Sequence, residues 1–320
     1  MQPVFIGGCD RSGTTMLGAM LGAHSACLCV PEAQFVIDLL GLSPLTGWQP
    51  GDLDGALQLV LGNPRFRLWD IELDITATRR QQIDSCAQLI QWIVVQYGVI
   101  HAKPVPDYWV DHTPWNTHYA ASLFDLFPQA KLVHIIRDGR AVASSIMPLR
   151  WGPKTIDQAA YFWLRNLSYG LAAESKYREH VLRVRYEELV GQPQESLHKL
   201  CAFIGLQYQP DMLKADGFSP PAFTAGQHAL VGQPLDPGRI DAWQSRLTTR
   251  QVEIFENITG DMLRYLGYQP VGDGKKRAMT FSEKVSSRLG MLRMFAGNLR
   301  QQRILQRYAG KNHLQTKKDA

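Results

Sequence analysis

A glycine-rich segment near the start of the chain constrains the fold more than any other feature. Residues 3–7 form an apolar, strand-like run, and residues 8–15 read Gly-Cys-Asp-Arg-Ser-Gly-Thr-Thr. Apolar residues then recur at the spacing of a helix. A strand, a glycine loop and a helix in this order direct backbone N–H groups and a helix N-terminus at an anion. The segment therefore predicts a phosphate-binding loop in an α/β fold.

The residue after the second glycine indicates which phosphate chemistry this loop supports. Nucleoside-triphosphate hydrolases with the spacing G-x-x-x-x-G carry a lysine next, whereas this chain has Thr14. Its cation is Arg11, two residues before Gly13. We expect the loop, with Ser12 and Thr15, to bind a 5′-phosphate group, and Arg11 to stabilise charge on a leaving phosphate. The alternative for the two threonines is simple helix capping.

A second strand-to-helix junction carries another candidate anion site. Residues 131–136 form a nearly continuous apolar run, which is typical of a buried parallel strand, and a helix begins in the Arg-Asp-Gly-Arg segment that follows. Arg137 lies where the strand ends, and Ser145 lies about two turns into the helix. Two anion sites at strand ends suit a nucleotide with phosphates at both ends of its ribose.

With these two segments the chain resembles sulfotransferases that use 3′-phosphoadenosine 5′-phosphosulfate (PAPS). It is most similar to the tyrosylprotein sulfotransferase branch and its bacterial relatives. The counterparts of that branch's motifs are residues 7–15, then His24 and Glu32, then residues 136–145. The resemblance spans about residues 3–268.

The resemblance implies an activity and further site residues. The activity is transfer of a sulfuryl group from PAPS to an acceptor hydroxyl, with 3′,5′-adenosine bisphosphate as the product. The acceptor classes left open are a peptide tyrosine, a sugar, a lipid and a small molecule. Tyr186 and Arg239 are implied to lie near the nucleotide. The alternative for Tyr186 is an ordinary aromatic residue at a strand end.

Two residues compete for the role of the base that accepts the proton of the acceptor hydroxyl. Glu32 matches the catalytic glutamate of the tyrosylprotein branch, and the alternative is that it stabilises a helix dipole. His112 falls where cytosolic small-molecule sulfotransferases carry a histidine, and the alternative is that it caps the helix near Trp115. The sequence shows no cluster with metal-ligand spacing, so we expect no essential metal.

The order of the predicted elements indicates the fold class. Helices between successive parallel strands predict an α/β, P-loop-like three-layer fold with a central parallel sheet flanked by helices. This sulfotransferase domain is predicted to span residues 1–270, with long substrate-facing loops at 41–51 and 216–238. The predicted strands lie near residues 4–7, 109–111, 131–136 and 181–185. The predicted helices lie near residues 14–23, 32–40, 78–97, 115–127, 140–147, 155–177, 194–204 and 248–266.

Residues 271–320 are predicted to form a basic amphipathic helical extension. From Lys275 onward, twelve Lys or Arg and two Asp or Glu give a net charge of +10, whereas the whole chain carries +5, so residues 1–274 carry about −5. Three outcomes are open for residues 275–311: packing on the acidic domain or a second subunit, contact with an anionic membrane surface, or disorder. The apolar residues are spaced three or four apart: Phe281, Val285, Leu289, Leu292, Phe295 and Leu299.

Composition limits the remaining classes of function. No stretch approaches the roughly 18 uninterrupted apolar residues of a membrane span, and the chain enters a strand by residue 4, so no secretory signal is visible. Five scattered cysteines suit reduced thiols. We therefore expect a cytoplasmic enzyme, peripheral on a membrane if its tail binds lipid, with no nucleic-acid partner. The alternatives are a P-loop kinase or NTPase-like phosphotransferase and a nucleotide-binding protein without turnover.

Overall fold

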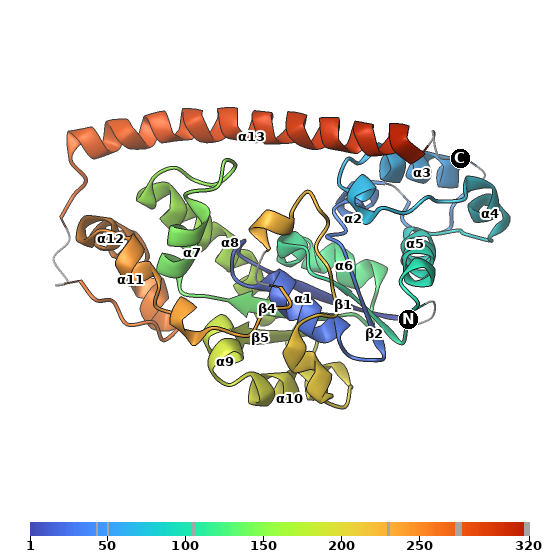
Figure 1. The fold of residues 1–320 in the computed structure, drawn as a ribbon, viewed down its shortest axis with the longest axis horizontal. Helices are drawn as coiled ribbons and strands as arrows, with labels where there is room; N and C mark the ends of the chain where they lie inside the picture. The colour runs from blue at the N-terminus through green and yellow to red at the C-terminus, as the bar shows by residue number, and fades with distance from the viewer. Residues whose placement is uncertain (43, 50, 104–105, 229–230, 273–276, 317–320) are drawn as a thin grey trace.

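The core of the fold is a five-stranded sheet in which every neighbouring pair runs parallel (Figure 1). The computed structural model describes all residues except 43, 50, 104–105, 229–230, 273–276 and 317–320. The strands lie in the order β2-β3-β1-β4-β5. This confirms the predicted α/β class with its central parallel sheet. The strands are β1 (Gln2–Gly8), β2 (Cys27–Val30), β3 (Tyr108–Asp111), β4 (Lys131–Ile136) and β5 (Val181–Arg185).

Both faces of the sheet are covered by helices, because successive side chains of a strand point to opposite faces. Phe5 and Trp109 pack into one hydrophobic cluster together with α5 (Cys86–Ile100). Val4 and Ile6 pack into another with α1 (Thr14–Gly22) and α10 (Pro193–Ile204). A third cluster joins α7 (Gly139–Ile146), α8 (Ile156–Lys176) and α12 (Thr249–Tyr265).

The remaining helices connect these layers. The short helix α2 begins after Glu32, so the alternative that Glu32 stabilises the first turn of a helix is wrong. The predicted helix 78–97 is also wrong, because it is divided in two. Ser85 has extended backbone angles and accepts a hydrogen bond from the Gln88 N–H, so α5 begins afresh there. These helices are α2 (Phe35–Leu39), α3 (Asp52–Gly62), α4 (Ile75–Arg80), α6 (Ala120–Leu126), α9 (Tyr186–Gly191) and α11 (Trp243–Arg246).

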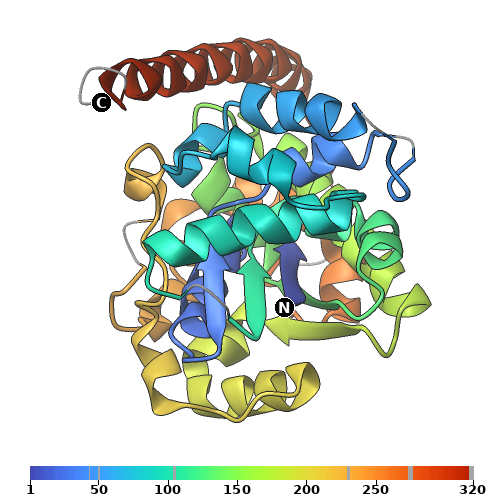
Figure 2. The same ribbon diagram turned by 90° about the vertical axis from the view of Figure 1, so that its right-hand side faces the viewer.

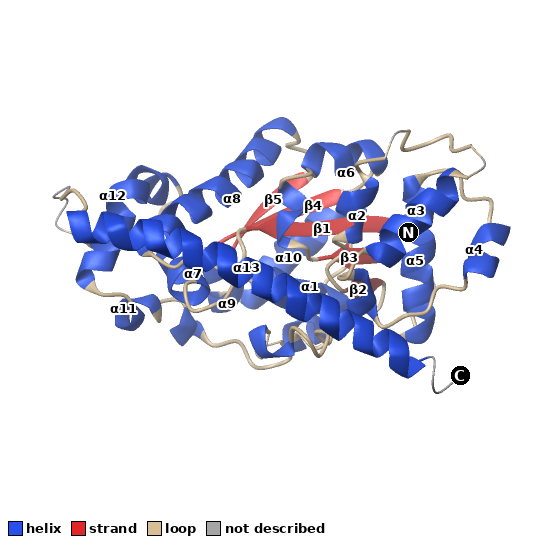
Figure 3. Ribbon diagram, turned by 90° about the horizontal axis from the view of Figure 1, so that it is seen from above, coloured by secondary structure: helices blue, strands red, loops and turns tan. Residues whose placement is uncertain are grey.

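The C-terminal helix α13 (Phe281–Thr316) lies along one edge of the molecule, at the opposite end from α10 (Figures 1 and 2). Seen from above, it crosses the whole molecule (Figure 3). It is attached to α12 by the ion pair of Glu283 with Arg250, at 2.9 Å. Residues 275–276, where the predicted tail begins, lie outside the described residues. No described helix has both the length and the hydrophobicity needed to cross a bilayer.

Candidate active site

The loop between β1 and α1 has a backbone that only glycine accepts at two positions. Gly8 has φ +155°, and a Cβ there would collide with the Ile135 carbonyl oxygen of β4. Gly13 has φ +102°, and its Cβ would lie 2.8 Å from the ring of Tyr186. Gly13 is the N-cap residue of α1 and no side chain caps the helix, so the capping alternative for Thr14 and Thr15 is wrong. Both threonines line a large cavity instead.

The structure brings the two predicted anion-binding segments into direct contact. The Arg11 Nε donates a hydrogen bond to Ser145 Oγ at 3.1 Å. In return, Arg137 Nη1 donates to the Arg11 carbonyl oxygen at 3.0 Å. The loop after β1 and the junction after β4 therefore form one continuous polar wall.

The two guanidinium groups of this wall are half-buried and lack carboxylate partners among the described residues. In the described part of the chain, neither Arg11 nor Arg137 forms an ion pair. Burial lowers the pKa of both groups, and the nearby charge of Arg137 lowers the pKa of Arg11 further. Charges that are partly removed from water and unpaired are costly, so this arrangement favours an anion.

Neighbouring residues hold Arg137 in place and leave part of it free. Its guanidinium lies 4.0 Å above the ring of the buried Tyr186, a cation–π contact. Among the described residues, Arg137 Nε and the buried Ser12 Oγ have no hydrogen-bond partner. Arg140 differs, because it is paired with Asp138 at 2.7 Å and with Glu256 at 2.6 Å. Arg140 is therefore structural, and Arg137 is available to a ligand.

Arg239 and His24 are placed differently from the other predicted residues. Arg137 Nη2 donates to the Arg239 carbonyl oxygen at 3.1 Å, but the Arg239 side chain is paired with Asp236. His24 Nδ1 accepts from the Ala26 N–H, so its Nε2 carries the proton and donates to the Gln207 carbonyl oxygen at 2.8 Å. Both ring nitrogens of His24 are thus occupied, as expected for a structural residue.

The cavity next to this wall has a volume of about 870 Å³, within the usual size range of small-molecule sites. One side is formed by the loop after β1 together with Arg137 and Tyr186. The rest of its lining is rich in aromatic and amide side chains from distant segments. These include Trp115, Tyr119, Trp151, Phe162, Asn166, Tyr169, Phe223, Asn298, Gln301 and Gln302.

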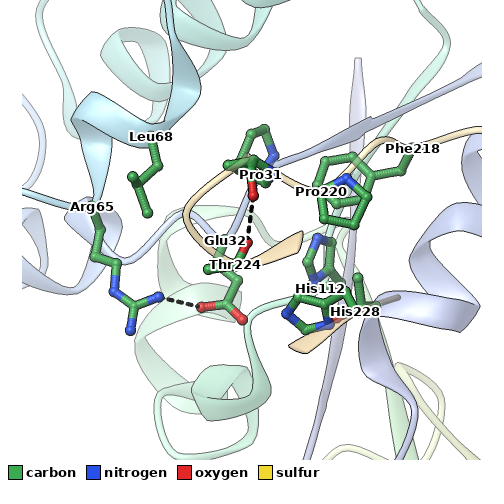
Figure 4. A pocket seen from close by; sticks show the side chains of 11 residues that line it. Pro31, Glu32, Arg65, Leu68, His112, Phe218, Pro220, Thr224 and His228 are labelled. Atoms are coloured by element: carbon green, nitrogen blue, oxygen red, sulfur yellow. Dashed lines mark hydrogen bonds and ion pairs between the residues drawn. The ribbon is translucent and has the colours of Figure 1, made fainter. Parts of the chain in front are cut away.

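Glu32 lies where this cavity meets a smaller one of about 20 Å³. Its carboxylate accepts a hydrogen bond from Gln34 Nε2 at 3.0 Å and pairs with Arg65 at 3.4 Å. Figure 4 shows it between the Arg65 guanidinium and the rings of His112 and His228. Thr15, the first-turn residue of α1, also lines both cavities. Glu32 is thus accessible from the large cavity and close to the loop that follows β1.

His112 lines only the smaller cavity and is 2% exposed. Its ring lies 4.8 Å from the ring of Phe218, and neither ring nitrogen has a partner among the described residues. Burial lowers its pKa, so the imidazole is neutral at pH 7. Thr113, not His112, is the N-cap residue of the short helix that follows, so the capping alternative is wrong.

Asp111 connects the segments that carry the two candidate bases. Its Oδ1 accepts from the Ala33 N–H at 3.2 Å, next to Glu32, and from the Thr113 hydroxyl at 2.6 Å, next to His112. Asp111 is 1% exposed, so these bonds are shielded from water. The relative positions of Glu32 and His112 therefore depend on the buried carboxylate of Asp111.

Sequence reasoning did not single out several residues of the site. Arg65 and His228 flank Glu32, and burial lowers the pKa of His228 to about 4. Asp10 also lines the large cavity, and burial together with the nearby Glu32 charge raises its pKa to about 6. The only available signal was for His228, which lies in the loop 216–238 that was predicted to face substrate. No sequence motif around Arg65 indicated that it belongs to the site.

The fold and the site define the class of the protein as an α/β protein with a P-loop-like loop after β1. Residues 3–210 match the Sulfotransferase family, and the chain belongs to this family. It is a sulfotransferase, an enzyme that transfers a sulfuryl group to an acceptor, which favours this activity over the phosphotransferase alternative. No described group of three or more His, Cys, Asp or Glu residues is arranged to hold a metal ion.

Known proteins show how far the similarity extends. Protein-tyrosine sulfotransferase 2 of Gallus gallus is 25% identical over 84% of this chain and 70% of its own length. Protein-tyrosine sulfotransferase 1 of Homo sapiens is 26% identical over 84% and 70%, respectively. The solved sulfotransferase domain from the curacin biosynthetic pathway superimposes with a TM-score of 0.57 at 21% identity, covering 84% of this chain and 98% of that domain. This last similarity supports the fold.

Proposed function

We propose that this sulfotransferase uses PAPS as its sulfuryl donor and an acceptor hydroxyl as its second substrate. The observation that carries the proposal is the pair of half-buried guanidinium groups of Arg11 and Arg137, which lack carboxylate partners in the described structure. The Arg137 guanidinium donates a hydrogen bond to the backbone carbonyl oxygen of Arg11, so the two residues are held side by side. A ligand with phosphates at both ends of its ribose supplies negative charge to both. Ser12 Oγ and Arg137 Nε, buried without partners among the described residues, fit the same ligand as hydrogen-bond donors.

The residues divide into two donor subsites under this proposal. The loop N–H groups, Thr14 and Thr15 would hold the 5′-phosphosulfate at the N-terminus of α1. Arg137 and Ser145 would hold the 3′-phosphate, and the Tyr186 ring would keep the Arg137 guanidinium in position through its cation–π contact. Charged donors form stronger hydrogen bonds than neutral ones. Arg137 is therefore expected to contribute most to the preference for nucleotides that carry a 3′-phosphate over those that lack it.

The transfer step follows from these positions. The acceptor oxygen attacks sulfur, a new S–O bond forms, and the S–O bond to the 5′-phosphate breaks with its electron pair remaining on the phosphate. Arg11 and the loop N–H groups stabilise the growing negative charge there. Glu32 accepts the hydroxyl proton and later releases it to solvent. The neutral His112 can donate a hydrogen bond to a sulfuryl oxygen beside Thr15.

Nucleotide discrimination tests the donor assignment. Isothermal titration is expected to show that 3′,5′-adenosine bisphosphate binds about 10- to 150-fold more tightly than AMP, because one charge-assisted site contributes about 1.5–3 kcal/mol. Arg137→Ala should remove most of this difference. Arg165→Ala, which changes an arginine elsewhere in the cavity, is the matched control and should preserve the ratio. Equal affinity of the unchanged protein for both nucleotides would overturn the assignment.

Labelled sulfate transfer tests the activity itself. The relatives are named protein-tyrosine sulfotransferases, so a tyrosine peptide is the first acceptor to screen with radiolabelled PAPS, followed by sugars, small phenols and lipids. A labelled acceptor is the expected result. Bisphosphate binding without transfer to any class would favour a nucleotide-binding protein without turnover.

A further inference from the structure

Helix α13 packs on the domain through a face of small, polar and a few apolar residues that lie outside the predicted stripe. Ser287 Oγ donates to Asp157 Oδ2 at 2.6 Å. Gly297 lies so close to the Arg150 carbonyl oxygen that a Cβ would collide with it. Leu305 and Ala309 are buried farther along the same face. The predicted outcome that the apolar stripe packs on the domain is therefore wrong, because other residues make the contact.

The apolar stripe faces outward and remains exposed. Leu292 is 67% exposed and Phe295 is 65% exposed. Of the 17 exposed large hydrophobic residues described in the chain, seven belong to α13. Exposed apolar side chains scattered singly are ordinary, but a contiguous stripe marks an interaction surface. The outer stripe consists of Phe281, Val285, Leu289, Met291, Leu292, Phe295 and Leu299.

Basic residues accompany this outer stripe, and acidic residues do not. Within residues 281–310, the single acidic residue is Glu283, which is already paired with Arg250. The helix carries six basic residues in the same span, and none forms an ion pair with a described residue. All six are exposed: Lys284, Arg288, Arg293, Arg300, Arg303 and Arg307. A partner that covers the outer stripe is therefore expected to supply negative charge.

A second copy of the chain fits this requirement poorly. Val285, Leu289, Leu292 and Leu299 follow the alternating spacing of a coiled-coil seam, with Ala296 between the last two. The positions beside such a seam would be occupied by Arg293, Arg300 and Arg307. Two copies of α13 would bring these like charges together, whereas coiled coils pair opposite charges there.

We propose that the outer stripe of α13 docks on an anionic lipid surface, with the helix parallel to the membrane plane. Such helices bury their apolar face at the boundary of headgroups and acyl chains, while Lys and Arg contact anionic headgroups. The helix has 36 residues, or about 54 Å, and lies along the edge of the molecule, so a flat surface can contact its whole length (Figure 1). The same helix contributes Asn298 and Gln301 to the large cavity, so docking would place the cavity beside the membrane.

Vesicle flotation with the full chain tests this docking. We expect binding to phosphatidylcholine vesicles that contain about one third phosphatidylglycerol, and little binding to phosphatidylcholine alone. The double variant Leu292→Gln, Phe295→Gln should lower binding at least about tenfold, because two exposed apolar groups no longer insert. Val99→Gln, Ile100→Gln is the matched control, since both residues are 58% exposed on α5, and it should bind normally.

Charge removal provides a second, independent arm. Arg300→Gln, Arg303→Gln should weaken binding to the anionic vesicles by up to about 25-fold, from about fivefold per basic residue. Arg80→Gln, Arg178→Gln removes two exposed charges elsewhere and should have no such effect. All the changed side chains are exposed, so melting temperatures should stay constant. The proposal is overturned if the anionic vesicles do not bind the chain, or if sedimentation velocity shows a dimer that Leu292→Gln, Phe295→Gln dissociates.

Discussion

The two sides of the large cavity are built in different ways. The side that would bind the donor comes from two short stretches of chain, the loop after β1 and the junction after β4, which meet at the carboxyl ends of neighbouring strands. The rest of the lining is assembled from segments far apart in sequence, including Arg65, His228 and α13. Under the proposed function, donor binding is therefore encoded locally, whereas the space for the acceptor depends on tertiary packing.

The backbone shows the same contrast. In the donor loop, Arg11 has φ 71°, in the left-handed region that non-glycine residues rarely adopt. Hydrogen bonds from Arg137 and to Ser145 hold it there. Such strain persists where the surrounding structure determines the conformation, and it is concentrated at functional sites. Changes on the donor side should therefore affect chemistry strongly, and changes on the acceptor side should affect recognition more mildly.

The largest effect is expected from Glu32, which lies where the large cavity meets the small one. Glu32→Gln keeps the size and most hydrogen bonds of the side chain but removes the base, so kcat should fall about 10²- to 10⁴-fold. The affinity for 3′,5′-adenosine bisphosphate should change little, because Glu32 is not part of the proposed donor subsites. Steady-state kinetics and isothermal titration measure the two quantities separately.

The control for this prediction is Glu72→Gln, the same change at an exposed position that lines neither cavity. It should leave both quantities unchanged. Normal turnover in Glu32→Gln, combined with abolished turnover in His112→Ala, would assign the base to His112. In that case the proton would be removed from the small cavity and not from the large one, because His112 lines only the small cavity.

A smaller effect is expected in the pH dependence of stability. Burial lowers the folded-state pKa of His112, whereas its unfolded pKa is about 6.5. As the pH falls through 6.5, the unfolded chain binds a proton that the folded chain does not, so the free energy of unfolding falls by at most about 1.4 kcal/mol per pH unit. Asp111, whose pKa burial raises, partly offsets this. Denaturant unfolding at pH 7 and pH 5 should show a smaller loss in His112→Gln than in the unchanged protein.

His228→Gln is the comparison from the acceptor side. Burial lowers the pKa of His228 to about 4, and it lowers the pKa of His112 to about the same value. Because the size of the pKa shift sets the pH dependence of stability, this dependence should change by a similar amount in His228→Gln and in His112→Gln. Identical pH dependence in His112→Gln and the unchanged protein would contradict a neutral, water-excluded imidazole at position 112.

The same contrast explains what could be predicted from the sequence. The donor segments 8–15 and 131–145 were recognisable because glycine positions, strand ends and helix starts are local features, and the structure places them together. The break before α5 was missed because the apolar periodicity continues across Ser85, whose capping bond is visible only in the structure. Arg65 was missed because only tertiary packing brings it to Glu32.

Helix α13 illustrates a further limit. Its apolar periodicity predicted the correct secondary structure but pointed to the wrong contact face, because Ser287, Gly297, Leu305 and Ala309 make the intramolecular contact. Hydrophobic patterning identifies a face that avoids water, and it does not say which partner removes the water. Close backbone approach at Gly297 leaves little hydrophobic signal in a sequence.

The smallest effect is expected from the inner face of α13. Asn298 and Gln301 line the acceptor side of the cavity and have no hydrogen-bond partner among the described residues. Asn298→Ala, Gln301→Ala should raise the KM for the acceptor about 3- to 10-fold, as expected for the loss of one or two uncharged hydrogen bonds. The bisphosphate affinity should be unchanged, because neither residue belongs to the proposed donor subsites.

Gln306→Ala is the matched control on the same helix, since Gln306 is exposed and does not line the cavity. It should leave the KM unchanged, which separates contact with the acceptor from a general effect on α13. If Asn298→Ala, Gln301→Ala instead weakens bisphosphate binding with no change in acceptor KM, the helix contributes to the donor side. The division between a locally encoded donor side and an assembled acceptor side would then be wrong, because a segment more than 150 residues away from both donor motifs would take part in donor binding.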